Sequence, residues 1–489
     1  MLSRSAVTVF VVVALAIPSP LFAQYTNVRV SNAASTDPEE ATLAINPADP
    51  LNLVAGANLR YFYYSMDGGL TWHQGQLSST LGVYGDPCVA FDGDGSAYYA
   101  HLSNPVAGDW LDRIVVQKSI AGGVGWSDGA GVGLNPPKDQ DKEWLVADLT
   151  DSPYRNNLYM AWTEFDLYGS RSPSDSSRIL FARSTNGGTV WSTPVRVSDT
   201  GGSCNDNDYT VEGAVPAVGP DGEVYVAWAG PLGIMLDKST DGGVTFGTDV
   251  FVTTQPGGWT FDVPGIYRAN GLPITVCDVS WGPHRGTVYV VWSDQRAGID
   301  DTDVFMMKST DGGQTWSGFT RVNDDPPGNQ QFFPWACVDP VTGFLWVVFY
   351  DRRDTTGLLT DVFVARSDDG GETFTNFRIS ESSFEPNGLI FFGDYINIAA
   401  IGGMVHPIWM RMDGGDLSIW TTTISDVTGI GHDVARADVE LMQNYPNPFN
   451  PTTTISFLLP SDTEVRLSVY DVAGRLIRTL IDGRRAEGP

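Results

Sequence analysis

The chain has 489 residues, with 58 acidic against 29 basic side chains and a formal net charge of −29. This excess of negative charge excludes nucleic acid and anionic membranes as partners, because both repel an acidic surface. Four cysteines without a Cys-x-x-Cys pair, and only five histidines, also exclude a Cys/His zinc site.

The chain begins with an export signal. Arg4 precedes an apolar run over residues 6–17, which is too short to span a bilayer comfortably. Ala23 then supplies a small residue at a cleavage point before Gln24. Residues 1–23 are therefore predicted to be a signal peptide rather than an anchoring helix. We expect the protein to be secreted or held at the outer-membrane cell surface.

A nonapeptide recurs along the rest of the chain. Its double glycine begins at positions 68, 122, 187, 242, 312 and 370, and the best copy is KSTDGGQTW at 308–316. Consecutive copies are separated by 54, 65, 55, 70 and 58 residues. A sequence period of this length is typical of repeat architectures, in which each repeat is one small structural unit.

The same order of short strands surrounds each copy. A first strand ends in a turn, as at 89–93, and a second is rich in β-branched and aromatic residues, as in VYVAW at 224–228. A third strand runs into the nonapeptide at 304–308, and a fourth leaves it at 320–323. Four strands per repeat predict an all-β protein, a β-propeller. Because residues 394–424 form a last unit without the nonapeptide, we expect seven blades, with six as the alternative.

The nonapeptide thus joins the third and fourth strands of its blade. Its Asp can accept hydrogen bonds from the N–H groups of a turn, and its glycine pair permits positive φ. The aromatic residue at its end fills space beside the next blade. A structural role, rather than an active site, is predicted for the aspartates Asp67, Asp241, Asp311 and Asp369.

The pattern Ser-x-Asp-x-Gly-x-Thr-Trp resembles the Asp box, or BNR repeat, of the sialidase-like propellers. Ser309–Trp316 matches throughout, and Ser65–Trp72, Ser239–Phe246 and Ser367–Phe374 match nearly as well. The resemblance lies within a predicted propeller domain over residues 24–424. It implies that the Asp boxes lie on the face opposite the catalytic one, and that the ligand is an extracellular glycan or glycoprotein.

On that opposite face, acidic residues recur at the predicted starts of inner strands. They are Glu40, Asp86, Asp141 with Glu143, Glu212 and Asp394. Because these carboxylates converge on the central axis, they repel one another unless a cation, an arginine or a ligand compensates. Calcium is the candidate ion, since it binds carboxylate oxygens. No other metal site and no cofactor are expected.

Candidate catalytic residues follow from the resemblance. Sialidases use a Tyr nucleophile assisted by a Glu, an Asp as acid and base, and three Arg that hold the substrate carboxylate. Tyr395, in GDYINIAAIGG, resembles the late Tyr of the family, and Glu212, in VEGAVPAVGPDG, resembles its Glu. Asp86 completes the candidate catalytic set. The candidate substrate-binding residues stand at the ends of second strands: Glu164, Arg296, Arg352 and Arg411.

The chain also departs from the family. The Arg-Ile-Pro motif near the N-terminus is absent, and the loop at 57–60 carries no Asp for the acid and base. Asp-x-Arg recurs at 294–296 and 351–353, which favours a structural or shared binding role for these arginines. Three functions therefore stay open: hydrolysis of sialosides, cleavage of another glycan, and binding of a carbohydrate or protein without turnover.

The composition shifts after residue 424, so residues 425–440 are predicted to be a linker. LMQNYPNPFNPTT at 441–453 resembles the start of the C-terminal sorting domain of type IX secretion substrates, and VRLSVYDVAGRLIRTL at 465–480 continues it as strand, turn and strand. The resemblance implies a truncated small β-sandwich over 441–489, with the outer-membrane secretion machinery as a partner. We expect a monomer.

Overall fold

The computed structural model describes residues 25–33, 35–106, 108–355 and 357–425, and four strand segments after them. The chain divides into two compact units, Met1–Asp426 and Val427–Pro489. In the described residues every regular element is a β-strand, and no helix there could span a membrane. The predicted signal peptide (1–23) and residues 426–439 of the predicted linker lie outside the described residues.

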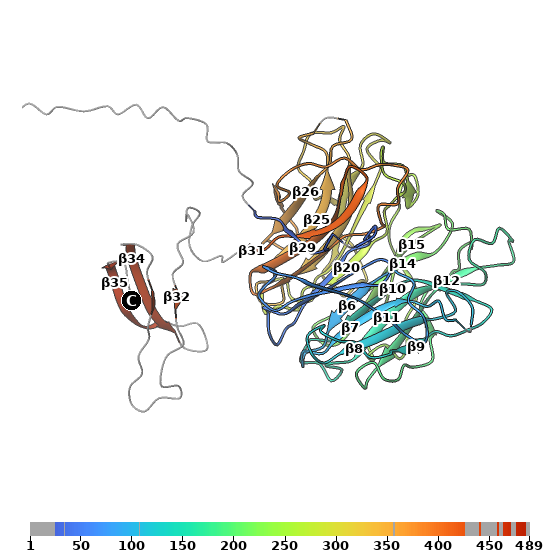
Figure 1. Ribbon diagram of the computed structural model, residues 1–489, viewed down its shortest axis with the longest axis horizontal. Helices are drawn as coiled ribbons and strands as arrows, with labels where there is room; N and C mark the ends of the chain where they lie inside the picture. The colour runs from blue at the N-terminus through green and yellow to red at the C-terminus, as the bar shows by residue number, and fades with distance from the viewer. Residues whose placement is uncertain are drawn as a thin grey trace, which may run out of the picture. The chain divides into compact units, whose positions relative to one another are not determined.

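Seven antiparallel sheets, or blades, follow one another in the first unit (Figure 1). The first two blades are β2 (Thr42–Ile45), β3 (Leu53–Ala57), β4 (Tyr61–Ser65) and β5 (His73–Gln76), then β6 (Cys88–Phe91), β7 (Ala97–Leu102), β8 (Ile114–Ser119) and β9 (Ala130–Val132). The third and fourth are β10 (Asp139–Ala147), β11 (Leu158–Phe165), β12 (Ser177–Ser184) and β13 (Val195–Arg196), then β14 (Glu212–Val218), β15 (Val224–Gly230), β16 (Gly233–Ser239) and β17 (Val250–Thr253).

A small hairpin separates the fourth blade from the fifth; its strands are β18 (Thr260–Phe261) and β19 (Ala269–Asn270). The fifth and sixth blades are β20 (Ile274–Cys277), β21 (Val288–Asp294), β22 (Asp303–Ser309) and β23 (Thr320–Arg321), then β24 (Gln331–Val338), β25 (Leu345–Asp351), β26 (Asp361–Ser367) and β27 (Thr375–Arg378). The seventh contains β28 (Asn397–Ile401), β29 (Met404–Asp413), β30 (Asp416–Thr421) and β31 (Ile424–Ser425).

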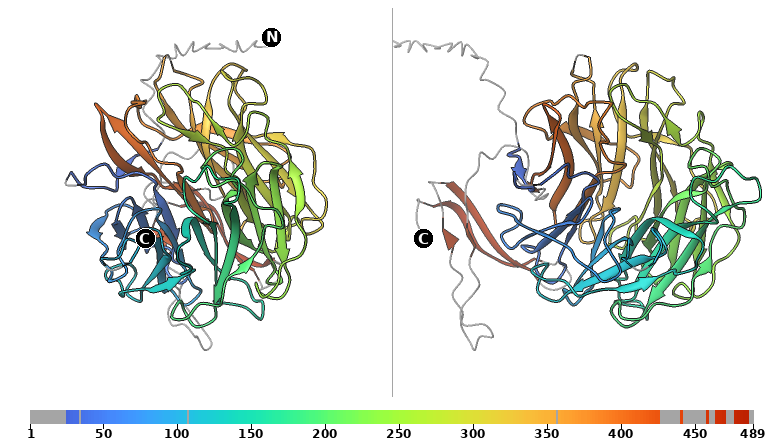
Figure 2. Two further views of the ribbon diagram at one scale, coloured as in Figure 1. Left: turned by 90° about the vertical axis from the view of Figure 1, so that its right-hand side faces the viewer. Right: turned by 45° about the vertical axis from the view of Figure 1, so that its right-hand side comes forward.

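The seventh blade takes one strand from the beginning of the chain. β1 (Val28–Arg29) pairs antiparallel with β30, with Val28 opposite Thr421. The innermost strands of the seven blades contact one another in chain order, and β28 returns to β2. The blades therefore form a closed ring, as the views in Figure 2 show. The prediction of a seven-bladed propeller is confirmed, and the six-bladed alternative is excluded.

Large aromatic side chains fill the space between blades at a repeated position. Trp162, Trp228 and Trp292 occupy the fifth position of β11, β15 and β21, and Phe349 occupies that position in β25. All four are fully buried. Burial of an aromatic side chain removes about 150–250 Å² of its surface from water. At about 25 cal/mol per Å² of buried apolar surface, each ring stabilises the packing of its blade by several kcal/mol.

The Asp boxes lie between the third and fourth strands of their blades. In the best copy, Ser309 Oγ donates a hydrogen bond to Asp311 Oδ1 (2.7 Å), and the Thr315 N–H donates to the same oxygen (2.9 Å). Asp67, Asp241 and Asp369 accept the equivalent bonds. These carboxylates fix the turn of their own blade, which is the structural role predicted for them.

A basic residue before the box links neighbouring blades. Lys308 Nζ donates a hydrogen bond to the Gly370 carbonyl of the following box (2.7 Å), and Lys238 Nζ donates to Gly312 (2.9 Å). Arg183 Nη1 makes the same contact with Gly242 (3.1 Å). The box therefore also ties its blade to the next one around the ring.

Two strand pairs are described in the second unit. β34 (Thr463–Tyr470) pairs antiparallel with β35 (Leu476–Arg485), and β32 (Glu440–Leu441) pairs with β33 (Phe457–Leu458). The longer pair corresponds to the predicted strand, turn and strand of 465–480. Residues 442–453 of the proposed sorting motif lie outside the described residues.

Candidate functional site

The inner strands begin with an unusual backbone conformation. Glu40, Asp86, Lys142 and Phe333 have φ of 57°, 52°, 52° and 50°, and Gly213 has φ of 73°. In β10, β14 and β24 the ladder register shifts at this point, which marks a β-bulge. A bulge re-aims its side chains, and a left-handed non-glycine residue costs about 1–3 kcal/mol. The same strained device, repeated in at least four blades, brings charged side chains together at the axis.

Lys142 gathers three of the acids predicted there. Its ammonium nitrogen lies 2.5 Å from Asp394 Oδ2, 3.6 Å from Asp86 Oδ2 and 3.9 Å from Glu40 Oε1. Burial favours the neutral amine, but the three carboxylates outweigh it and hold the pKa of Lys142 well above its usual value. The cation that compensates these acids is therefore a lysine on β10.

Arg268, between β18 and β19, supplies the second cation. Its Nε donates to Asp394 Oδ1 (2.8 Å), and Nη2 donates to the other oxygen of the same carboxylate. Burial opposes ionisation of Asp394, but Lys142 and Arg268 together lower its pKa well below the usual range. Asp394 is thus a carboxylate held ionised between two bases.

Other acids at the axis lack such partners. Glu212 is 1% exposed, and its Oε2 has no hydrogen-bond partner among the described residues. Burial, reinforced by the charges of Asp206 and Asp141, raises the pKa of Glu212 well above its usual value. Burial and Asp86 similarly raise the pKa of Asp141 to about 8. The acids at the axis therefore have pKa values shifted in opposite directions, upwards for Glu212 and Asp141 and downwards for Asp394.

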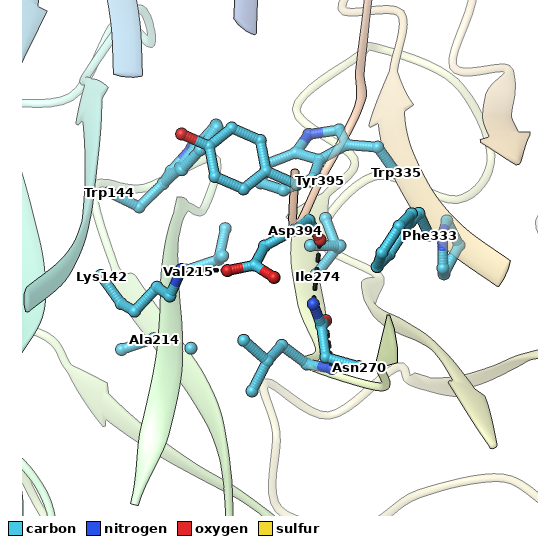
Figure 3. A pocket seen from close by; sticks show the side chains of 13 residues that line it. Lys142, Trp144, Ala214, Val215, Asn270, Ile274, Phe333, Trp335, Asp394 and Tyr395 are labelled. Carbon is cyan, nitrogen blue, oxygen red and sulfur yellow. Dashed lines mark hydrogen bonds and ion pairs between the residues drawn. The ribbon is translucent and has the colours of Figure 1, made fainter. Parts of the chain in front are cut away.

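An apolar cavity, the axial pocket, lies beside these acids. Its walls come from the starts of β10, β14, β20 and β24 and from the segment before β28, and its volume is about 50 Å³. Trp144 and Trp335 have ring centroids 4.2 Å apart, and Tyr395 stands perpendicular to Trp144 at 5.5 Å. Figure 3 shows these three rings together on one side, with the Lys142 ammonium directed at Asp394.

A larger opening, the hairpin pocket, adjoins the axial pocket and shares Lys142, Asn270, Leu272 and Asp394 with it. Its volume is about 410 Å³. The remaining lining residues come from β14, the loop before it and the β18–β19 hairpin: Asp206, Glu212, Trp259, Thr260, Phe261, Asp262, Tyr267, Arg268 and Ala269. The two pockets together offer a polar entrance and an aromatic floor.

The candidate nucleophile Tyr395 lies at the axial pocket. Its hydroxyl donates to the Pro87 carbonyl (2.9 Å), and in Figure 3 it points away from Asp394. Burial, followed by the charges of Glu40 and Asp86, raises its pKa well above the usual value. A phenol in such surroundings resists the deprotonation that a nucleophile needs. The structure brings Tyr395, Glu212 and Asp86 to one region, and their catalytic roles stay predictions.

Arg296 and Arg411 line neither pocket. Arg296 Nη2 lies 2.6 Å from Asp294 Oδ2, and its guanidinium stacks over Phe305 at 4.4 Å. Arg411 Nε lies 2.7 Å from Asp413 Oδ2. Arg411 Nη1 also donates to Ser382 Oγ (2.8 Å), and Arg296 Nη2 donates to the Thr254 carbonyl (3.3 Å), so both guanidinium groups are already bound to protein groups.

Arg352 and Glu164 are likewise engaged away from both pockets. Arg352 donates to the Pro264 carbonyl (2.7 Å) and stacks over Phe332. Glu164 Oε1 lies 2.6 Å from Arg178 Nη1. None of the four candidate substrate-binding residues lines either pocket, and their binding role stays a prediction.

The calcium expectation stays untested. In the described part of the chain, no group of three or more His, Cys, Asp or Glu side chains is arranged to hold a metal ion. Lys142 and Arg268 lie among the carboxylates that had suggested one. From the sequence, no role was predicted for Arg268, which lies on a hairpin that follows the fourth blade. The sequence signal for that inserted hairpin is the 70-residue spacing between the boxes at 242 and 312.

Fold and ring closure define the chain as a seven-bladed β-propeller. No protein-family model matches it, and no curated protein does. Solved structures match this chain, and three of them, described next, each have a TM-score of 0.45. The NanB sialidase of Streptococcus pneumoniae is 9% identical over 76% of this chain and 83% of its own. An alpha-L-arabinanase of Penicillium chrysogenum complexed with arabinobiose is 14% identical over 82% and 98%.

The third is a protein of unknown function from Dyadobacter fermentans, 13% identical over 69% of this chain and 93% of its own. At these identities the likeness extends to the propeller fold alone. The chemistry of the site must therefore be argued from the residues of this chain.

Proposed function

We propose that this chain is an exported propeller that binds an extracellular glycan through the axial and hairpin pockets. One observation carries the proposal: aromatic rings and carboxyl groups line two adjoining pockets that share four residues. Pockets that combine apolar walls with a few convergent polar groups are the usual sites of small-ligand binding. Sugars need both, since their rings have apolar C–H faces and hydroxyl edges.

A glycan array followed by calorimetric titration tests this proposal. Asp206→Ala removes a carboxylate from the pocket wall and should weaken binding about tenfold or more. Glu223→Gln serves as the control, because Glu223 lies in the β14–β15 turn on the Asp-box face, in a hollow that it lines together with Asp311 of the next blade. Equal losses in both variants, or no binding to any glycan, would contradict the proposal.

Hydrolysis is the second candidate function. Glu212 has a raised pKa and Asp394 a lowered one, and both line the hairpin pocket. Two carboxyl groups with opposite shifts suit a general acid and an ionised partner in glycoside cleavage. The two bases bound to Asp394 weigh against it as a nucleophile, which is why binding is placed first.

Turnover is tested with a panel of fluorogenic glycosides that includes a sialoside. If the chain is a hydrolase, Glu212→Gln should lower kcat by about 100-fold or more, because it removes the proton donor. Tyr395→Phe tests the candidate tyrosine nucleophile separately. Activity that survives Glu212→Gln and disappears in Tyr395→Phe would replace the two-carboxyl scheme with a sialidase-like one.

Export completes the proposal. It is supported by the apolar run at 6–17 and by the sorting-domain motif at 441–453. In a bacterium with type IX secretion, the protein should appear outside the cell with Gln24 as its first residue, which mass spectrometry measures. Retention of an uncleaved chain in the cytoplasm would contradict the export proposal and leave the pocket argument unchanged.

A further inference from the structure

We propose that the hairpin pocket recognises a sugar residue that carries a free, protonated amine, with Glu212 and Asp206 as the acceptors. The inference rests on the proposed glycan-binding function and specifies its ligand class. It is carried by the charges that line the pocket and by one buried carboxyl oxygen that lacks a partner.

The charges of the hairpin pocket disfavour an acidic sugar. Four carboxyl groups line it against two bases, Lys142 and Arg268. Both bases are already bound to Asp394. Among the described lining residues no further base remains for a substrate carboxylate. An acidic sugar would have to displace Asp394 from its buried ion pairs, and separating such pairs is strongly unfavourable.

Glu212 supplies the positive argument. Its side chain is almost completely buried, lines the pocket, and has an Oε2 without a hydrogen-bond donor. A buried acceptor without a donor destabilises the protein, and a ligand that supplies the donor removes this penalty. An ammonium group carries three N–H donors and a charge of the required sign. Asp206, 3.8 Å from Arg268, offers a second acceptor in the same wall.

The protonation of Glu212 gives the site a measurable signature. The groups that act on it are Asp206 and Asp141, which raise its pKa, and Lys142 and Arg268, which lower it; Tyr168 also faces this group of acids. Its raised pKa favours the protonated form of Glu212 in the free protein. When an ammonium binds there, the O–H bond breaks, the carboxylate accepts an N–H, and the proton passes to the buffer. A neutral sugar leaves that proton in place.

The probes are three oligosaccharides: a trisaccharide of glucosamine, its fully N-acetylated form, and sialyllactose. Calorimetric titrations at pH 6, in two buffers of different ionisation enthalpy, measure both affinity and proton release. We expect the glucosamine trisaccharide to bind about tenfold or more tightly than the acetylated one, with up to one proton released. Sialyllactose should bind most weakly.

Variants connect the preference to the residue. Glu212→Gln should abolish proton release and the preference for the amine, while Glu223→Gln on the Asp-box face should retain both. If Glu212→Gln does not fold, Asp206→Asn takes its place and should reduce the preference, since it removes the negative charge of the second acceptor. Asn also tolerates the left-handed φ of 46° at this position. A preference that persists in a folded Glu212→Gln would overturn the proposal.

The outcomes separate this inference from the glycan proposal. Equal or tighter binding of the acetylated trisaccharide overturns the amine inference and leaves glycan binding intact. The amine inference is also overturned if butylamine binds as tightly as the glucosamine trisaccharide, because the pocket would then recognise the ammonium charge alone and not a sugar residue. If no glycan binds at all, on the array or in solution, both proposals fail together.

Discussion

The two faces of this propeller use the same kind of residue in opposite ways. On the Asp-box face, each aspartate is at least partly exposed and is hydrogen-bonded within its own turn. Partial burial opposes ionisation of Asp241, but bonds from Thr245 and Ser239 lower its pKa to about 2. At the axis, Glu212 and Asp141 are buried and their pKa values are raised.

The contrast shows how a repeated acid can be assigned. A box aspartate meets the same partners in every blade, so its repetition is explained by the turn that it fixes. The axial acids also recur, but their partners differ from blade to blade: Asp394 has two bases and Glu212 has none. Repetition with constant partners indicates structure, and repetition with unequal partners indicates a site.

The largest predicted effect is at Lys142. Lys142→Met removes the cation shared by Asp394, Asp86 and Glu40, and leaves buried carboxylates uncompensated. We expect the free energy of unfolding to fall by about 3–5 kcal/mol, measured by urea denaturation. Lys138→Met is the control, since that lysine is more exposed and should cost about 1 kcal/mol or less. If the free energy of unfolding fell by similar amounts in the two variants, Lys142 would not be the cation that compensates the buried acids at the axis.

The next effect depends on pH. The pKa of Asp141 is about 8 in the folded protein, above its unfolded value, so the native state binds the extra proton and stability is lost as pH rises from about 4 towards 8. Asp141→Asn should therefore stabilise the protein by about 2 kcal/mol at pH 8 and by almost nothing at pH 4. Thermal unfolding at both pH values measures this, and equal shifts at the two would disprove it.

A box substitution should cost less and leave the site intact. Asp311→Ala removes the acceptor for Ser309 and Thr315, which should lower the free energy of unfolding by about 1–2 kcal/mol. The box aspartates have lowered pKa values, so their contribution is present above pH 4 and is lost as pH falls towards 2. Glycan affinity should not change; a loss of affinity would make the box part of the site.

The smallest effect concerns the link between blades. Lys308→Met removes the hydrogen bond to the Gly370 carbonyl and the ion pair with Glu372, at a cost of about 0.5–1 kcal/mol by urea denaturation. Lys308→Arg should retain most of the stability, because Arg183 makes the equivalent bond to Gly242. If Arg were as damaging as Met, the link would not be the reason for a basic residue there.

The sequence predicted what depends on local pattern. Strand alternation and the repeated box led to seven blades, and the starts of the inner strands led to the acids at the axis. Both follow from residues close together in the chain. Arg296 and Arg352 were candidates because they stand at the ends of second strands. The recurrence of Asp-x-Arg favoured a structural or shared binding role, and Arg296 and Arg353 each pair with the Asp two residues earlier.

What the sequence did not predict depends on distant partners. Arg268 meets Asp394 across 126 residues, from a hairpin that no other blade repeats. β1 completes the seventh blade by pairing with β30, nearly 400 residues later. Neither contact produces a repeated pattern in the sequence, because sequence periodicity depends only on residues that are close together in the chain. The pocket arises from such unrepeated contacts, so it was the least predictable part of the molecule.

The pairing of β1 with β30 also has a mechanical meaning. Residues 25 and 425 both leave the propeller from the seventh blade, where β1 and β31 pair with its other strands. A force applied between these two points therefore loads that blade before any other. The two-residue β1 pair would part first, while β28 kept its contacts with β2 and the other six blades kept their own hydrogen bonds.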